Sequence, residues 1–409
     1  MPVTSYLTNQ GFLGTAAEAT IGTPVAAQSY VQLLDESIEH EPGIVLEKLL
    51  RGSRDAAFVP VLGESKIAGK FDTPLYVDQG MHLLTAVIGG DIYQTGGAST
   101  GNVALSANAA AGATGISIAA QTSPTAIGAG DYVELRQNGA GAAGAGNLSE
   151  IHKVASVSGT GPYTVTFAAG ETLRYAYTAS SAAVFRIAGS TTAFTHGLLP
   201  DIPSPSAYKT LTLEKCLGGL TSLQYAGTLI SKMALALSSK NAAKATWDVM
   251  ALSEAQITPS TPVFGTSAPL ALADFAVSLF GSPDPSIATF DLDIDNTGKE
   301  YWTFNGQNLP SIVAPVERKI TGKFTSIVQS MSYYNDMTAG TSGVGVLTLT
   351  QGAASISITL PRLTLTKLSM PLKIGELLMY DAEFQAAYSD TYGLSLSAQV
   401  VNGKYLPFI

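Results

Sequence analysis

Apolar and polar residues alternate with a period of two along many short segments, which is the pattern of half-buried β-strands. The clearest case is KIAGKF at residues 66–71, which places its two lysines on one face and Ile67, Gly69 and Phe71 on the other. Valine, isoleucine, threonine and aromatic residues recur in such segments and favour sheet. The same pattern predicts strands over residues 30–39, 208–213, 229–237, 245–252, 290–295, 319–324, 345–350, 355–366, 377–386 and 395–401.

Other segments predict helices and connections. Residues 81–88 have the apolar spacing of a short helix that ends at Gly89. Residues 270–280 have a similar spacing after Pro269, a residue suited to the start of a helix. Residues 1–28 are small and polar, with glycine and proline, and we expect an arm or loop there. The predicted fold class is therefore mainly β, with short flanking helices.

One strand motif occurs twice. KIAGKF at residues 66–71 returns as KITGKF at residues 319–324, which is 253 residues later (319 − 66). A repeat at this distance predicts that one folding unit occurs twice in the chain. The flanking segments continue the match, and the expected counterparts are Ile38 and Ile294, Asp35 and Asp291, Glu39 and Asp295, Trp247 and Tyr380, and Asp248 and Asp381.

The two copies differ by a long insertion. Trp247 and Tyr380 lie only 133 residues apart (380 − 247), so the first copy holds 120 extra residues (253 − 133). Residues 96–195 have short β-type runs between Gly-, Ala- and Ser-rich turns, and they predict a small β domain with a mobile exposed loop at 138–146. The predicted domains are residues 1–95 with 196–254 (first tandem fold), 96–195 (insertion) and 255–409 (second tandem fold).

Composition and charge exclude several classes of protein. Only 13% of the 409 residues are charged, about half of the ~25% of an average domain, and the formal net charge is −9. A general nucleic-acid binder would need a basic stripe. Cys216 is the single cysteine, which excludes a disulfide framework and a cysteine metal site. We expect no signal peptide, and no apolar run approaches the ~20 residues of a membrane span, so we expect a soluble chain made in the cytosol.

The signatures of catalysis and metal binding fail. Phe71 stands where a phosphate loop around Gly63 and Lys70 would need serine or threonine. DLDID opens like a calcium-binding loop, but Asn296 replaces its glycine and Trp302 its final glutamate. The histidines lack the i, i+4 spacing of zinc sites and are His40, His82, His152 and His196. The sequence therefore predicts neither an enzyme nor a metal or cofactor site.

Charged residues recur on strand faces. DLDID alternates strictly, so its three aspartates share one face, which is either simply solvated or turned toward an anion that must not bind. The lysines of the KI-x-GKF strands give the opposite charge on another strand, where they either pair with nearby acids or contact a neighbouring subunit. A long connection at 42–63 adds two arginines. The candidate contact residues are Lys66, Lys70, Lys319, Lys323, Arg51 and Arg54.

Five segments carry a family resemblance: Asp295 with Asn296, the KI-x-GKF strand, SYYND at 332–336, LPRLTLTK at 360–367, and the closing residues 386–405. In this order they resemble the tail tube proteins of long-tailed bacteriophages (siphophages). The resemblance implies a twisted β-sandwich or split barrel with a flanking helix, whose sheet joins those of neighbours to line a closed ring. Such rings stack into the tube through which DNA leaves the capsid. Two tandem folds imply homotrimeric rings with pseudo-six-fold symmetry.

The resemblance also implies partners and roles for surfaces. The expected partners are copies of this chain and the tape measure, terminator and distal tail proteins of a virion assembled in the host cytoplasm; DNA passes without specific binding, and no membrane is involved. The connections 42–63 and 297–318 would reach the next ring, and the insertion would project outside. Two alternatives stay open: a distal tail or baseplate hub protein of the same fold, and a surface adhesin that binds carbohydrate. The lumen-lining candidates are Asp35, Glu39, Asp291, Asp293 and Asp295.

Overall fold

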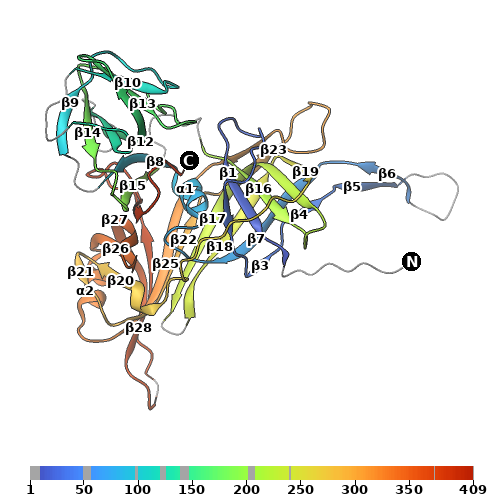
Figure 1. Cartoon of the computed structure of the whole chain (residues 1–409). Helices are drawn as coiled ribbons and strands as arrows, with labels where there is room; N and C mark the ends of the chain where they lie inside the picture. Colours follow the sequence, from blue (N-terminus) through green and yellow to red (C-terminus); the bar gives the residue numbers. More distant parts are fainter. Residues whose placement is uncertain are drawn as a thin grey trace.

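The computed structural model describes residues 10–48, 57–96, 100–119, 126–138, 147–200, 208–238, 241–372 and 374–408, and the mainly β class predicted from the sequence is confirmed. An antiparallel central sheet runs through the molecule (Figure 1). Its strands, in order from one edge to the other, are β3 and β4 (Asp35–Glu36 and Glu39–Glu41), β7 (Lys66–Pro74), β18 (Asn241–Ala251), β17 (Ser222–Ser238), β22 (Ile287–Asp295), β25 (Lys319–Ile327), β28 (Met379–Ala386) and β27 (Ala354–Ser369).

Two smaller covering sheets pack against the central sheet. The long strands β17 and β27 belong to both layers, because their C-terminal halves lie in the central sheet and their N-terminal halves in a covering sheet. Beside β17 lie β2 (Ser29–Val31), β1 (Leu13–Ala17), β16 (Leu211–Cys216) and β19 (Ser253–Ile257). Beside β27 lie β21 (Ser282–Pro283), β20 (Phe275–Leu279), β26 (Ser342–Gln351) and β29 (Ser397–Asn402).

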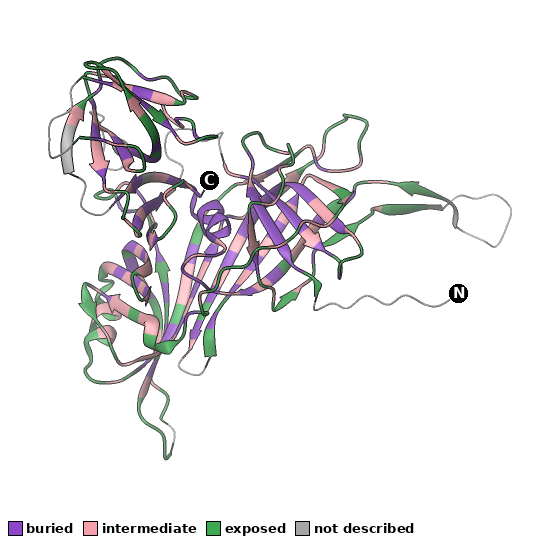
Figure 2. Ribbon diagram, viewed as in Figure 1, coloured by how far each residue is buried: buried purple, intermediate pink, exposed green. Residues whose placement is uncertain are grey.

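The core lies between these layers, where buried residues concentrate (Figure 2). The alternation seen in the sequence explains why. Ile67 and Phe71 of the first KI-x-GKF strand and Ile320 and Phe324 of the second are all buried, whereas the lysines between them point away from the core. Two helices complete the packing, α1 (Met81–Ile88), which is buried along its length, and α2 (Ser332–Ala339).

The two halves of the chain repeat one order of elements and one pattern of strand pairing. In each half an outer strand pair is followed by an edge strand, a hairpin, the KI-x-GKF strand, a helix and four further strands. The hairpins are β5 (Ile44–Lys48) with β6 (Ala57–Leu62), and β23 (Gly298–Tyr301) with β24 (Ile312–Pro315). The corresponding elements are β1 and β20, β2 and β21, β3–β4 and β22, β5–β6 and β23–β24, β7 and β25, α1 and α2, β16 and β26, β17 and β27, β18 and β28, and β19 and β29.

Strand registers correct the alignment expected around the repeated motif. Glu41 lies opposite Lys66 as Asp295 lies opposite Lys319, so Glu41 rather than Glu39 is the counterpart of Asp295 (295 − 41 = 254). Trp247 lies opposite Phe71 as Ala382 lies opposite Phe324, so the counterpart of Trp247 is Ala382 rather than Tyr380 (382 − 247 = 135). The expected counterparts of the acidic strand (Ile38, Asp35, Glu39) and of Asp248 shift in the same way. Each error is two residues, which leaves every side chain on the face that the sequence predicts.

Two other predictions of local structure are wrong. Residues 270–280 form only a single helical turn at Leu272–Asp274, followed by strand β20. The alternation of Phe275, Val277 and Leu279 suits a strand, and pairing with β26 decides between the two periods. The N-terminal segment is no loose arm over residues 13–17, because β1 is buried between β2 and β16.

The glycine of each KI-x-GKF strand stands where the neighbouring atoms leave no room for a side chain. A Cβ atom at Gly322 would overlap the backbone oxygen of Asp291 and the ring of Phe384, and one at Gly69 would overlap the backbone of Ser37. We expect Gly322→Ala to lower the free energy of unfolding by about 3 kcal/mol, the upper range for overpacking. Chemical denaturation of the unassembled chain measures this value.

A matched substitution separates crowding from the general effect of glycine replacement. Gly128 has only a carboxylate oxygen 3.6 Å from the position of an added Cβ, so Gly128→Ala should change stability by less than about 1 kcal/mol. Equal losses in the two variants would contradict the close-approach explanation.

The insertion is a small β unit on a two-stranded stem. The stem strands β8 (Gly90–Thr95) and β15 (Phe194–Leu199) pair with each other, and β15 also pairs with β29 of the second half. Beyond the stem, a separate core includes Val133, Val165 and Phe167. The strands around it are β9 (Thr100–Ala104), β10 (Gly115–Ile118), β11 (Tyr132–Asn138), β12 (Asn147–Ser158), β13 (Tyr163–Phe167) and β14 (Ala182–Ile187). Most of the loop expected at 138–146 lies outside the described residues.

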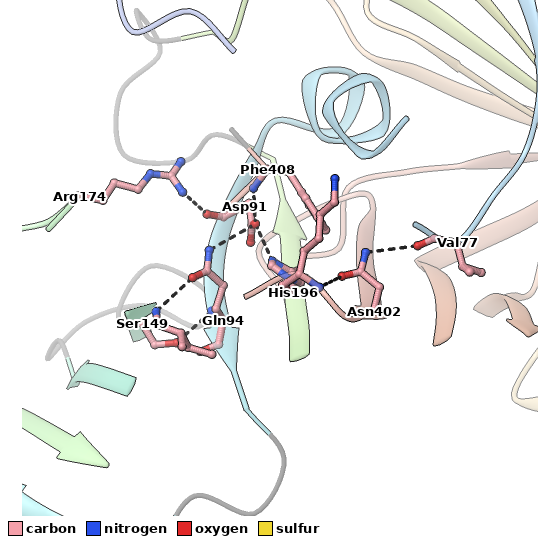
Figure 3. A network of polar contacts seen from close by, with 10 residues as sticks. Val77, Asp91, Gln94, Ser149, Arg174, His196, Asn402 and Phe408 are labelled. Carbon is pink, nitrogen blue, oxygen red and sulfur yellow. Dashed lines mark hydrogen bonds and ion pairs between the residues drawn. The ribbon is translucent and has the colours of Figure 1, made fainter. Parts of the chain in front are cut away.

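A buried polar network ties this stem to the C-terminal segment (Figure 3). His196 on β15 and Asp91 on β8 are fully buried, with Nδ1 of the ring 2.8 Å from Oδ2 of the carboxylate. Nε2 of the ring lies 2.7 Å from the carbonyl oxygen of Lys404, and the backbone N–H of Phe408 donates to the same Asp91 oxygen at 3.0 Å. Each nitrogen of the ring therefore lies within hydrogen-bonding distance of an oxygen atom. Further members are Gln94, Ser149, Arg174, Asn402 and Val77.

Candidate assembly surfaces

One face of the central sheet points away from the core and carries charged side chains of both signs; we call it the open face. It is formed by the alternate residues of each strand that include Lys66, Lys70, Asp291, Asp293 and Asp295. From the sequence alone, the acids and the lysines are predicted to form two separate surfaces. The strand registers place them side by side instead, because the acidic strand pairs directly with the lysine strand in each half.

Ion pairs cross the strands of the open face. In the second half, Nζ of Lys323 lies 3.4 Å from the carboxylate of Asp291. In the first half, Nζ of Lys66 lies 2.8 Å from the carboxylate of Glu41, which raises the pKa of the lysine. Such exposed pairs contribute little to stability, so their main effect is to order the charges. Further pairs join Lys232 with Asp293, Lys244 with Asp72, and Lys367 with Glu383.

The balance of charge on the open face is negative. Among the described strand residues of this face there are ten carboxylates and seven lysines, a net charge of −3 (7 − 10) out of −9 for the whole chain. Burial raises the pKa of Asp248 in the middle of the sheet, and Lys232 opposes that rise. The acids are Asp35, Glu39, Glu41, Asp72, Asp248, Asp291, Asp293, Asp295, Asp381 and Glu383; the lysines are Lys66, Lys70, Lys232, Lys244, Lys319, Lys323 and Lys367.

Within the described part of the chain, the central sheet ends in two unpaired strand edges. One is the β3–β4 edge of the first half, and the other is the C-terminal half of β27 in the second half. Apolar side chains stand exposed beside both edges, with Leu34 near the first and Leu372, 88% exposed, near the second. An unpaired edge with exposed apolar neighbours is a template for pairing with another strand.

A two-stranded arm formed by β5 and β6 projects from the body of the molecule (Figure 1). A ribbon of two strands is marginally stable alone in water, so an arm of this kind is suited to contact with another surface. Arg51 and Arg54, the contact candidates in this connection, lie outside the described residues. The arm's exposed apolar side chains are Ile44, Val45, Leu46, Val61 and Leu62.

The corresponding hairpin of the second half lies against the body instead. Nε1 of Trp302 lies 3.4 Å from the backbone oxygen of Ser65, and the amide of Asn308 donates to the Ser65 hydroxyl at 2.7 Å. Phe304 at its tip is nevertheless fully exposed. The connections 42–63 and 297–318, for which the sequence analysis predicts the same role, therefore differ in the structure. The β5–β6 arm extends further from the core (Figure 1).

The described residues hold no group of three or more histidine, cysteine, aspartate or glutamate side chains arranged to bind a metal ion. Over the same residues, no helix is both long enough and apolar enough to cross a membrane. The described surface features that could contact other molecules are the charged open face, the strand edges and the apolar arm.

Surfaces of this kind suit a protein that assembles by adding strands to strands. A family model described as "Phage tail tube protein" matches residues 8–386, and the chain belongs to this family of virion tail components. The family carries out self-assembly into a tube. No curated protein matches the sequence.

Sequence reasoning missed several charged members of the open face: Glu41, Lys232, Asp248, Lys367 and Glu383. The alternation of Lys244, Thr246 and Asp248 along β18 was a signal that could have found one of them. Lys232 and Lys367 needed the strand registers, because each follows a bulge that reverses the alternation.

Proposed function

We propose that three copies of the chain close into a ring with pseudo-six-fold symmetry, and that stacked rings form the tail tube of a siphophage, the conduit for DNA ejection. The observation that carries this proposal is the antiparallel pairing of β17 with β22, which joins two repeats of one fold edge to edge inside a single chain. Repetition of this junction between chains adds the same unit by the same rotation. A head-to-tail contact of this kind gives a ring when the rotation closes.

In this proposal the chain consists of residues 1–95 with 196–254 as the first tube domain, residues 96–195 as an inserted domain, and residues 255–409 as the second tube domain. The repeated order of elements supports the division. The insertion lies outside the tube, because its stem joins β29 in a covering sheet rather than the open face. It would occupy three of the six equivalent positions around a ring.

The open face lines the lumen in this proposal, since it is the face of the central sheet that the covering sheets leave uncovered. Asp35, Glu39, Asp291, Asp293 and Asp295 belong to it, and its carboxylates outnumber its lysines. A net negative wall repels phosphates, so DNA slides instead of binding. Lysines held in cross-strand ion pairs present less attraction to DNA than unpaired ones.

Contacts between rings would come from the β5–β6 arm. Its exposed apolar side chains lose their contact with water when they dock on the next ring, at ~25 cal/mol per Å² of apolar surface buried. Arg51 and Arg54 in the same connection are the candidates for ion pairs there. The tape measure, terminator and distal tail proteins are the further partners expected in the virion.

Electron microscopy and native mass spectrometry of the purified chain test the proposal. We expect hollow tubes, and rings of about 127 kDa (3 × 42.3 kDa) when the tubes are dissociated. Rings of six chains would disprove the trimer, and a chain that stays monomeric under all conditions would disprove the assembly. A distal tail or hub protein of the same fold predicts single rings that never stack, which the same images reveal.

A further inference from the structure

We propose the register of the contact between neighbouring chains: the C-terminal half of β27 pairs antiparallel with β4 of the next copy, with Lys367 opposite Glu41. This inference rests on the ring proposed above and names the partner surface within it, a second copy of the same chain. The two edges are the unpaired ends of the central sheet, so their union continues that sheet from one chain into the next.

The junction inside the chain supplies the template. β17 pairs with β22 so that Lys232 lies opposite Asp295 and Ala234 lies opposite Asp293. Nζ of Lys232 lies 3.8 Å from the carboxylate of Asp293, so the junction carries an ion pair on the open face. Among the described residues, it joins a strand of the second repeat to the edge of the first repeat's part of the central sheet.

The position of Lys367 in the second repeat matches that of Lys232 in the first. Lys232 follows a bulge and lies opposite Asp248, and Lys367 follows a bulge and lies opposite Glu383. Asp248 and Glu383 are themselves counterparts, because they face the equivalent lysines Lys70 and Lys323. Lys367 is therefore the counterpart of Lys232, at the same spacing of 135 residues (367 − 232) that separates Asp248 from Glu383.

The other edge is matched in the same way. Glu41 and Asp295 lie opposite the first lysines of the two KI-x-GKF strands, Lys66 and Lys319. Replacing each member of the Lys232–Asp295 pair by its counterpart gives Lys367 opposite Glu41. Two residues further along β27, Ser369 then lies opposite Glu39. This pair is the counterpart of Ala234 and Asp293, which lie opposite each other inside the chain.

Burial supports the same edge. Leu237, in the template strand, is only 3% exposed, but its counterpart Leu372 is 88% exposed (372 − 237 = 135). Met233 is buried, whereas its counterpart Leu368 is only partly buried. The second repeat thus leaves open to water the apolar positions that the first repeat covers with β22. Docking of the next copy would cover them.

Charge and backbone chemistry restrict the register. The β4 edge presents Glu39 and Glu41 on the open face, and Lys367 is the cation that the β27 edge offers them. A register displaced by one residue would place His40 opposite Lys367 and put the two glutamates of the next copy on the other face of the joined sheet. Pro371 has no backbone N–H, so it limits the hydrogen-bonded ladder to the residues before it. The paired core of the junction is therefore short and spans residues 367–369 and 39–41.

Disulfide trapping tests this register. The variant Glu39→Cys/Ser369→Cys, in a Cys216→Ser background, brings the two thiols opposite each other between chains, at the ~4.5–5.5 Å Cα separation of paired antiparallel residues, which permits a disulfide. Oxidation of assembled tubes should convert most of the chain to covalent dimers and trimers that separate under reduction. A closed three-chain ring gives no larger product.

Two further pairs act as controls. Ala234→Cys/Asp293→Cys is the equivalent pair inside one chain and should form an intramolecular disulfide without oligomers. Glu41→Cys/Ser369→Cys shares the open face but is displaced by two residues, and it should cross-link at least ten-fold less. Stronger cross-linking of the displaced pair, or none of the proposed pair within tubes seen by microscopy, would overturn the register while leaving the tube function intact. Failure of the unmodified chain to form tubes would overturn both.

Charge exchange tests the same junction without cysteines. Lys367→Glu places three carboxylates together between chains and should weaken ring assembly at least ten-fold, and Glu41→Lys should weaken it as well. The double exchange Lys367→Glu/Glu41→Lys restores opposite charges and should recover assembly measured by sedimentation. Equal assembly of the single and double variants would contradict the proposed pairing.

Discussion

Replacing His196 with alanine should lower the free energy of unfolding by about 3–5 kcal/mol, because the change leaves the Asp91 carboxylate buried without its imidazole partner. The hydrogen bond to the carbonyl of Lys404 is lost at the same time. The Phe408 ring, which stacks on the imidazole with centroids 4.1 Å apart, also loses its contact. Denaturant unfolding of the unassembled chain measures the effect.

Two comparisons identify the cause of that loss. His40→Ala removes an exposed histidine 3.9 Å from Glu254 and should cost less than about 0.5 kcal/mol. Asp91→Asn/His196→Ala removes the buried charge together with its partner, so it should be more stable than His196→Ala alone. A double variant less stable than the single one would show that packing, and not the unpaired carboxylate, dominates.

The tandem repeat was predictable because one strand kept nearly the same six residues. Three positions of this strand are restricted by their surroundings. Ile67 and Phe71 must fill the core, and Gly69 must leave room for the neighbouring backbone. The partner strands have no comparable constraint on identity, only on alternation. Alternation is unchanged by a shift of two residues, so the sequence could not distinguish Glu39 from Glu41 as the counterpart of Asp295.

Contacts between distant parts of the chain decided the features that the sequence missed. The apolar run at 270–280 fits a helix or a strand equally well until β26 lies beside it. The members of the buried network, Asp91, His196 and Phe408, are too far apart in the chain to form a motif. Each reads as an isolated residue, and the pairing of β15 with both β8 and β29 brings them together.

The candidate surface residues were identifiable by type but not by arrangement. The aspartates of DLDID and the lysines of KI-x-GKF stood out because both alternate on strands. Whether they share a face depends on the pairing of β22 with β25, and this register is set by contacts between strands rather than by either segment alone. Their role in lining a lumen stays a prediction.

A graded change of charge on the open face tests that role. Asp291, Asp293 and Asp295 contribute three of the negative charges, so replacing all three with asparagine brings the described face from −3 to 0 per chain, and replacing them with lysine brings it to +3. The asparagine variant keeps side-chain shape and avoids new repulsion beside Lys323 and Lys232, which now pair with two of these acids. We expect both variants to form tubes, with the lysine tubes less stable.

If the open face lines the DNA path, the lysine tubes should retain DNA at low salt and release it as salt rises. Each added cation near a phosphate contributes to the salt dependence, and a Debye length near ~8 Å at ~0.15 M salt confines the effect to charges close to the path. Retention measured on purified tubes across a salt series should increase from the unmodified chain to the asparagine tubes and then to the lysine tubes. Three exposed acids outside this face, Glu64, Glu317 and Asp390, provide a matched control when replaced with lysine. Retention by the control tubes that equals that of the open-face lysine tubes would place the DNA path elsewhere.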